Sequence, residues 1–195
     1  MARGEGVLSA ELDMLELALH ILDIAENSTR AGARHVDIRL KEDPNQDLLT
    51  MEITDDGDGM DEETLTKALD PFYTTKKVRR VGLGLPMLAQ AAECTGGQMI
   101  LSSQPGKGTQ LKVTFGLRHL DRQPLGDVAG SMVTLIAGNP DIDFTYTHER
   151  RDKIYFLSTE EIKKEIDDVP INHVEVLKYI RSHIAEGMKE IGSEA

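Results

Sequence analysis

The residues best suited to chemistry lie in one acidic stretch, TMEITDDGDGMDEE at 50–63, in which seven of fourteen residues are Asp or Glu. One chemistry that such a stretch suggests is calcium binding by an EF-hand loop, which needs oxygen ligands at positions 1, 3, 5 and 12 and glycine at position 6. Placing either glycine at position 6 fails: Glu52 and Thr54 fit positions 1 and 3 poorly in one register, and Leu65 occupies position 12 in the other. The residues before the acidic cluster alternate like a strand, whereas an EF-hand has a helix there. The acidic stretch therefore needs another explanation.

A second candidate set follows one face of a helix that we predict over residues 11–30. The polar residues of this face recur at steps of four, three, four and three: Glu16, His20, Asp23, Asn27 and Arg30. Leucines repeat at helical spacing on the same segment, namely Leu12, Leu15, Leu19 and Leu22. The polar face is either a solvent-facing stripe or part of a site. Because Leu17, Ile21 and Ile24 flank it, we expect much of the helix to be buried.

A basic cluster, KKVRR at 76–80, stands out in an otherwise acidic chain. It is either a solvated loop or the contact for a small anionic ligand. Gly82 and Gly84 follow it and precede a predicted helix with Pro86 in its first turn, a position that suits proline. The free N–H groups at a helix start favour an anion.

The elements that must position these residues alternate between helices and strands. We expect strands at 35–40 and 48–54, a short helix at 61–69, a loop at 70–84, a helix at 85–94 and a hairpin at 98–117. After a linker at 121–131, we expect strands at 132–138, 143–148 and 153–158. Ser158 with Glu161 and Asn172 with Glu175 have the capping-box spacing that begins a helix. The last helix carries a long apolar stripe.

Composition excludes several classes of protein. The 195-residue chain has 34 Asp and Glu against 22 Lys and Arg, a net charge of −12, so it lacks the basic surface that nucleic acids need. No apolar run approaches the roughly 20 residues of a membrane span, and the first residues lack the apolar stretch of a signal peptide. A single cysteine, Cys94, excludes an internal disulfide framework. We therefore predict a cytoplasmic protein that binds neither nucleic acid nor membranes.

Four segments, in this order, resemble the GHKL family, which includes gyrase, the ninety-kilodalton heat-shock chaperone, histidine kinases and the mismatch-repair protein MutL. They are LDIAENSTRAGARHVDI, similar to the N box; TDDGDGM, similar to the first glycine box; DPFYTTK, similar to the F box of histidine kinases; and GLGL, similar to the second glycine box. The resemblance covers residues 11–118 and implies a Bergerat ATP-binding fold, an α/β (α+β) two-layer sandwich with a mixed sheet. We expect residues 1–119 to form this histidine-kinase-like ATP-binding domain and residues 120–195 a small C-terminal α+β appendage.

The resemblance also implies where adenine binds. Asp55 would accept a hydrogen bond from the exocyclic amine of adenine, and Gly57 and Gly59 would leave room for the flat base. The acidic stretch would then face the uncharged end of ATP. Further residues that the family motifs assign to ATP are Met60, Phe72, Thr75, Gly82, Leu83, Gly84, Leu85 and Thr109.

The phosphates and Mg²⁺ would lie by the cations and the polar helix face. Arg30 and Lys76 would contact phosphate, and Asn27 would give a carbonyl oxygen to Mg²⁺. Asp23 stands where gyrase and MutL carry the Glu that activates water, so it is the candidate catalytic residue. Since Asp is one methylene shorter, Asp23 is alternatively a carboxylate that only binds Mg²⁺-bound water. We expect residues 74–82 to form a lid that ATP orders.

The implied function is that of a Mg-ATP-dependent protein kinase acting on a partner protein in trans, either a split histidine kinase or an anti-sigma-type serine kinase. Alternatives are an ATP-hydrolysing conformational switch of MutL or gyrase type, and a module in which ATP is structural. Only ten residues precede the first predicted helix, too few for the dimerising hairpin with its acceptor histidine. His148 has the His-Glu-x-Arg order of an acceptor box but lies between predicted strands, so we expect the acceptor on another protein. The apolar stripe of the final helix must be buried, either on the ATP-binding domain or in the interface of a homodimer or with a partner protein.

Overall fold

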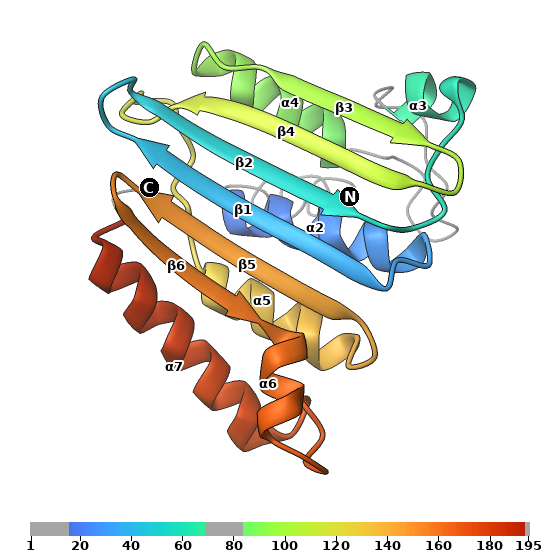
Figure 1. Cartoon of the computed structure of the whole chain (residues 1–195). Coiled ribbons are helices and arrows are strands. Elements are labelled where there is room, and N and C mark those ends of the chain that lie inside the picture. The colour runs from blue at the N-terminus through green and yellow to red at the C-terminus, as the bar shows by residue number, and fades with distance from the viewer. Residues whose placement is uncertain (1–15, 69–83, 194–195) are drawn as a thin grey trace, which may run out of the picture.

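A computed structural model describes residues 16–68 and 84–193, which form a mixed six-stranded sheet with helices (Figure 1). The strands are β1 (His35–Asp43), β2 (Leu48–Asp55), β3 (Met99–Gln104), β4 (Gly108–Gly116), β5 (Asp143–Arg150) and β6 (Lys153–Ser158). Their order across the sheet is β3-β4-β2-β1-β5-β6. Within the described residues β1 and β5 pair in parallel, and the other neighbouring strands pair antiparallel. The predicted α+β fold with a mixed sheet is confirmed.

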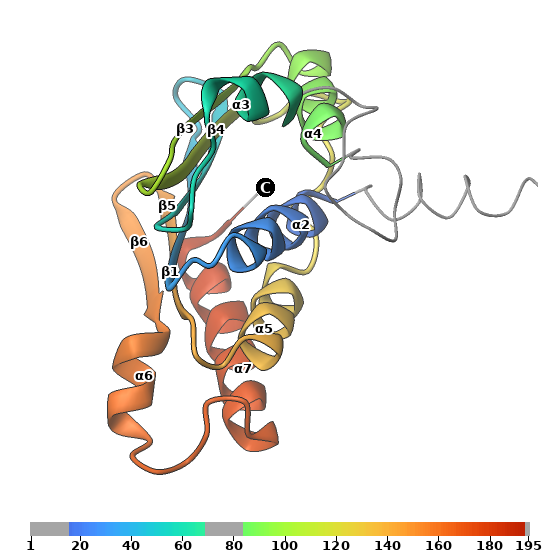
Figure 2. The ribbon, with the colours of Figure 1, turned by 90° about the vertical axis from the view of Figure 1, so that its right-hand side faces the viewer.

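The described residues contain six helices. They are α2 (Leu17–Arg30), α3 (Glu62–Ala68), α4 (Gly84–Cys94), α5 (Val128–Gly138), α6 (Thr159–Glu165) and α7 (Val174–Ile191). Figure 2 shows the sheet nearly edge-on, with α2, α4, α5 and α7 all on one side of it. None of the helices in the described ranges is both long and apolar enough to span a membrane.

The alternation of side chains along β2 brings Asp55 to the helix side of the sheet. In β2 the residues Leu49, Met51 and Ile53 are buried, and the residues between them are more exposed. Side chains of a strand alternate between its two faces, so Asp55 shares the buried face with these three. Asp55 is only 9% exposed, which places a carboxylate at the edge of the core.

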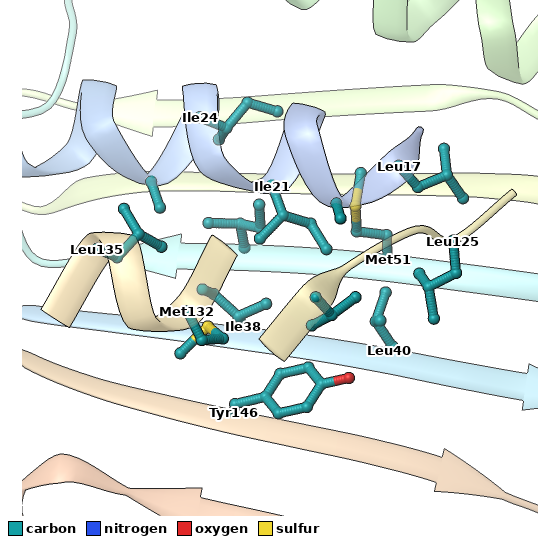
Figure 3. Packing of buried hydrophobic residues seen from close by; sticks show 14 of the residues in the cluster. Leu17, Ile21, Ile24, Ile38, Leu40, Met51, Leu125, Met132, Leu135 and Tyr146 are labelled. Atoms are coloured by element: carbon teal, nitrogen blue, oxygen red, sulfur yellow. The ribbon is translucent and has the colours of Figure 1, made fainter. Parts of the chain in front are cut away.

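Helix α2 lies across the middle of the sheet. Its large buried apolar side chains are Leu17, Ile21 and Ile24, which repeat at steps of four and three and so line one face. Figure 3 shows them in one cluster with Met51 of β2, and Met132 of α5 lies next to Ile38 of β1 in this view. The expectation that much of this helix is buried is confirmed, and Leu19 and Leu22 are partly buried beside these three. The helix ends before Gly32, which adopts a φ of 73°.

Residues beyond 119 continue the same sheet. Tyr146 of β5 aligns with Ile38 of β1, and α5 packs on α2, where the Ser131 hydroxyl donates to the Ala18 carbonyl at 2.9 Å. Leu17 N–H also donates to the Pro124 carbonyl at 3.0 Å. The division into two units at residue 119 remains a prediction, and it falls within one hydrophobic core.

Two local predictions for this part were wrong. Residues 132–138 belong to α5 and not to a strand, because Asp127 caps the helix by accepting from the Gly130 N–H at 2.8 Å. The apolar run MVTLIAG has no period that distinguishes a buried strand from a buried helix. The last helix is capped by His173, one residue after the predicted Asn172. The predicted Ser158 cap is confirmed, since its hydroxyl accepts from Glu161 N–H at 3.3 Å.

A buried polar cluster holds β1, β5 and the C-terminal residues together. The Glu42 carboxylate is fully buried and lies 2.9 Å from His148 Nε2 and 3.2 Å from Arg150 Nε. The Ser193 hydroxyl donates to Glu42 at 2.6 Å, and Tyr146 OH lies 2.9 Å from the second ring nitrogen of His148. His148 is therefore a core residue with both nitrogens hydrogen-bonded, which is consistent with the expectation that it accepts no phosphate.

Candidate functional site

A cavity of about 370 Å³ lies between α2 and strands β2, β3 and β4, with α3 and the start of α4 completing its wall. Its lining residues are Asp23, Ile24, Asn27, Ser28, Arg30, Ala31, Ile53, Asp55, Gly59, Met60, Thr64, Ala68, Gly84, Leu85, Leu101, Thr109 and Leu111. A mostly apolar lining with a few convergent polar groups, at this volume, is typical of a site for a small organic ligand.

The carboxylate of Asp55 is the most tightly held polar group of the cavity. Its Oδ1 accepts from the N–H of Gly57 at 3.0 Å and from the N–H of Thr109 at 3.2 Å. Its Oδ2 accepts from the Ser28 hydroxyl at 2.6 Å. Three donors on a carboxylate fix its orientation and offset the cost of burying its charge. Asp55 therefore presents a fixed acceptor to the cavity.

A second network joins the loop after β2 to the β3–β4 hairpin. The hydroxyl oxygen of Ser103 accepts from Met60 N–H at 2.8 Å and lies 2.8 Å from the Gly108 carbonyl oxygen. It also lies 2.9 Å from Thr109 Oγ1. Met60 and Thr109 both line the cavity and Ser103 does not, so Ser103 holds two parts of the cavity wall from outside the lining.

The α2 side of the cavity meets the start of α4. Asp23 and Asn27 lie one turn apart on α2, and the Arg30 guanidinium donates to Asn27 Oδ1 at 2.5 Å. A Cβ added to Gly84, the first residue of α4, would collide with the Asp23 carboxylate. A carboxylate, an amide oxygen, a guanidinium and a helix start thus line one part of the cavity, a combination that suits a cation bound together with an anionic ligand.

Nine of the residues predicted for the site line this cavity: Asp23, Asn27, Arg30, Asp55, Gly59, Met60, Gly84, Leu85 and Thr109. Gly57 does not line it, although its N–H holds Asp55. The predicted residues Phe72, Thr75, Lys76, Gly82 and Leu83, and the whole predicted lid at 74–82, lie outside the described residues. That the nine bind ATP stays a prediction.

The two glycines of the acidic stretch have a structural reason that the sequence did not reveal. Gly59 has a φ of 67°, and a Cβ there would collide with the Gln104 carbonyl. A Cβ on Gly57 would lie 2.8 Å from the Ala31 carbonyl oxygen. Both glycines let the loop pack against other backbone, and the room that they would leave for a base stays a prediction.

Sequence reasoning missed Ser28 and Ser103. Ser28 continues the deepest stripe of α2, four residues after Ile24, and a lone polar residue in an apolar stripe is a signal that it has a buried partner. Ser103 lies on an ordinary strand with a similar serine, Ser102, beside it, and its partners come from the loop after β2. No local pattern distinguishes Ser103 from Ser102.

Two ionisable groups near the cavity have shifted pKa values. Burial lowers the pKa of His20 from 6.5, and the hydrogen bond to Gln123 and the charge of Asp23 only partly oppose this shift. Burial alone would raise the pKa of Asp56, but the N–H groups of His35 and Arg34 donate to its carboxylate and lower it overall. Asp56 therefore fastens the loop after β2 to the start of β1.

Comparisons with known proteins agree with this geometry. Residues 12–119 match the family model HATPase_c, described as "Histidine kinase-, DNA gyrase B-, and HSP90-like ATPase". The chain is 39% identical over 71 residues to "Sensor kinase CckA" of Brucella abortus, covering 36% of this chain and 8% of that protein. It is 38% identical over 75 residues to "Sporulation kinase E" of Bacillus subtilis, covering 38% of this chain and 10% of that protein. The matched segments are thus a small part of these relatives.

A solved structure described as "Crystal Structure of N terminal domain of a DNA repair protein" has a similar fold. The superposition has a TM-score of 0.54 at 17% identity and covers 93% of this chain and 60% of that one. At this identity the likeness concerns the fold alone. It extends well beyond residue 119, in keeping with the continuous sheet.

Proposed function

Because the chain belongs to the HATPase_c family of histidine kinase-, DNA gyrase B- and HSP90-like ATPases, we propose that its cavity binds Mg-ATP and that it transfers phosphate from ATP to a partner protein in trans. The observation that carries the proposal is the fixed acceptor of Asp55 inside the cavity that Asn27, Arg30 and the start of α4 also line. A neutral base with an amine and a charged phosphate chain need these two environments within one site.

Adenine is proposed to lie on the sheet side of the cavity. Its exocyclic amine donates to the Asp55 carboxylate, a charge-assisted hydrogen bond. Ile53, Leu101 and Leu111 provide the apolar surface for the base. A carboxylate already held by Ser28 loses little conformational freedom when the ligand binds, which favours affinity.

The phosphates and Mg²⁺ are proposed to lie on the α2–α4 side. Asn27 Oδ1 is a ligand that Mg²⁺ accepts, and that ion keeps its remaining positions for water and phosphate oxygens. Arg30, which now donates to Asn27 Oδ1, would gain an anionic partner when phosphate is present. Bound Mg²⁺ would neutralise charge on the phosphates, and the N–H groups at the start of α4 would face them. The residues present therefore fit the ion.

Kinase activity is supported by the names of the relatives, which are a sensor kinase and a sporulation kinase. Transfer to another protein is supported by the burial of His148, whose ring lies within the core with both nitrogens engaged. Whether the acceptor is histidine or serine defines the two forms of the proposal, a split histidine kinase or an anti-sigma-type serine kinase.

Hydrolysis coupled to a conformational change is the second candidate. The position of Asp23 favours it, because its carboxylate lies against the first residue of α4 in the part of the cavity proposed for phosphate. A carboxylate there can accept a proton from an attacking water. Asp23 is the proposed catalytic base in that case. In the kinase it would orient Mg²⁺-bound water.

The two candidates are separated by γ-labelled ATP. The chain is incubated with label and with purified proteins encoded by its neighbouring genes. Label on one of those proteins that is absent with an Asp55→Asn chain supports the kinase, and its stability to acid distinguishes phosphoserine from phosphohistidine. Free phosphate without labelled protein supports the hydrolytic switch. Tight ATP binding with neither product would contradict both and leave ATP as a structural ligand.

A further inference from the structure

The side-chain oxygens of three residues, Ser28, Asp55 and Thr109, line the sheet side of the cavity. What each offers a ligand depends on where the hydroxyl hydrogens point, because a hydroxyl has one hydrogen to donate and two lone pairs that accept. The direction of the hydrogens therefore decides which edge of a base the cavity accepts.

The hydrogens around Asp55 are all used within the protein. Ser28 Oγ lies 2.6 Å from the carboxylate and 3.4 Å from the Ile24 carbonyl oxygen, so its hydrogen goes to the carboxylate. The N–H groups of Gly57 and Thr109 point to the other carboxylate oxygen. Neither Ser28 nor Asp55 has a hydrogen left for a ligand.

The hydrogen of Thr109 is fixed by Ser103. The carbonyl oxygen of Gly108, 2.8 Å from Ser103 Oγ, can only accept, so Ser103 donates its one hydrogen there. The N–H of Met60 occupies one lone pair of Ser103. The contact of 2.9 Å between Ser103 and Thr109 is then a hydrogen bond in which Thr109 donates. Thr109 Oγ1 offers only lone pairs to the cavity.

We propose that Ser103, which does not line the cavity, is a positioning residue that sets the purine specificity of the site by keeping Thr109 an acceptor. The proposal rests on the proposed function, since it concerns the base that the ATP site reads. A 6-aminopurine presents hydrogens to the acceptors of Asp55 and Thr109. A 6-oxopurine presents an oxygen to the same lone pairs and finds no donor, which a site of this kind rejects strongly.

The test compares the dissociation constants of ATP and inosine triphosphate, which carries an oxygen in place of the 6-amino group, by calorimetry with Mg²⁺ present. The wild-type chain should prefer ATP by about a hundredfold or more. In Ser103→Ala, Thr109 is free to rotate its hydrogen into the cavity and donate to the 6-oxo group, so the preference should fall by about tenfold. Ser103→Thr keeps the hydroxyl and should keep the preference.

Ser102→Ala is the matched control, because Ser102 is the neighbouring residue on β3 and points to the exposed face of the sheet. Ser103→Ala also removes the contact with Met60 N–H, so its effect on that loop must be separated from its effect on Thr109. In a chain that already carries Thr109→Val, adding Ser103→Ala should leave the preference for ATP unchanged. Thr109→Val alone should also still prefer ATP, because it creates no donor.

Several results would overturn the proposal. They are equal binding of the two nucleotides by the wild-type chain, the same preference in Ser103→Ala and Ser102→Ala, or a Ser103→Ala effect that persists with Val at 109. If Ser103→Ala does not fold, Thr109→Val decides alone: a tenfold rise in preference for ATP would show that Thr109 donates to the ligand, against the proposal. Absence of ATP binding by the wild-type chain would instead contradict the proposed function.

Discussion

The hydroxyl oxygen of Ser28 lies 2.6 Å from Oδ2 of Asp55, joining the helix α2 to the end of strand β2. Both side chains are largely buried, with exposed fractions of 4% and 9%. The bond links the motif on the helix to the acidic stretch, two segments that are separate in the sequence. The position of the Asp55 carboxylate, the main acceptor in the cavity, thus depends on the uncharged hydroxyl of Ser28.

Replacing Ser28 tests this link. In Ser28→Ala the carboxylate of Asp55 loses one of its three donors, so we expect ATP affinity to fall by about threefold to tenfold and the free energy of unfolding by about 1–3 kcal/mol. Calorimetry and urea unfolding measure the two effects. Thr29→Ala is the control, since the Thr29 hydroxyl donates to the Glu26 carbonyl and Thr29 does not line the cavity. Equal effects of the two substitutions would mean that Ser28 does not position Asp55.

Gly84→Ala tests the contact between α4 and α2. The added methyl group would collide with the Asp23 carboxylate and displace it. Displacing a reacting group by about 1 Å is costly, so we expect phosphate transfer or hydrolysis to fall on the order of tenfold to a hundredfold. Gly138→Ala is the control, because a Cβ there meets nothing within 4 Å. Turnover that is equal in the two variants would exclude a catalytic role for this contact.

His20 should make stability depend on pH. Burial lowers its pKa below 6.5 in the folded chain. Well above pH 6.5 the imidazole is neutral in both the folded and the unfolded state and contributes no pH dependence. Below this pH the unfolded state binds a proton first, so the free energy of unfolding should fall as pH decreases towards the folded pKa. Urea unfolding between pH 7.5 and pH 5 should show a shallower decrease for His20→Gln than for the exposed control His119→Gln, and parallel curves would contradict this assignment.

Glu42 should matter more for stability than its position at the end of a strand suggests. Its carboxylate has no exposed surface and contacts His148, Arg150 and Ser193. Glu42→Gln removes the buried negative charge that His148 and Arg150 contact, and we expect it to lower the free energy of unfolding by about 3 kcal/mol. Glu52→Gln, which removes the more exposed ion pair with Lys112, should cost less than about 1 kcal/mol. If urea unfolding shows similar losses of unfolding free energy for the two variants, the buried cluster around Glu42 stabilises the fold no more than an exposed ion pair does.

Local patterns in the sequence were enough to predict the part of the fold around the cavity. The alternation of Leu49, Met51 and Ile53 predicted β2, and the four motifs in their order predicted the ATP-binding fold. These features are local, because a strand shows its buried face by its period and a motif by its spacing. The resemblance to the family motifs also predicted nine of the residues that line the cavity.

The rest depends on contacts between distant segments. The apolar run at 132–138 becomes a helix because of its Asp127 cap and its place against α2, and neither follows from hydrophobic content. The parallel pairing of β5 with β1 joins segments about a hundred residues apart. Ser103 gains its role from Met60 and Thr109, which the chain brings to it only through the sheet.

Calorimetric titration of Mg-ATP into the wild-type chain and an Asp55→Asn variant tests the central claim most directly. The variant turns one fixed acceptor oxygen into an amide that can place a donor opposite the adenine amine. We expect it to lose about 2 kcal/mol of binding free energy, on the order of thirtyfold in affinity. Asp56→Asn is the matched control, because the neighbouring Asp56 holds the N–H groups of Arg34 and His35 and does not line the cavity. ATP affinity that is unchanged in Asp55→Asn, or lowered equally in both variants, would contradict the account.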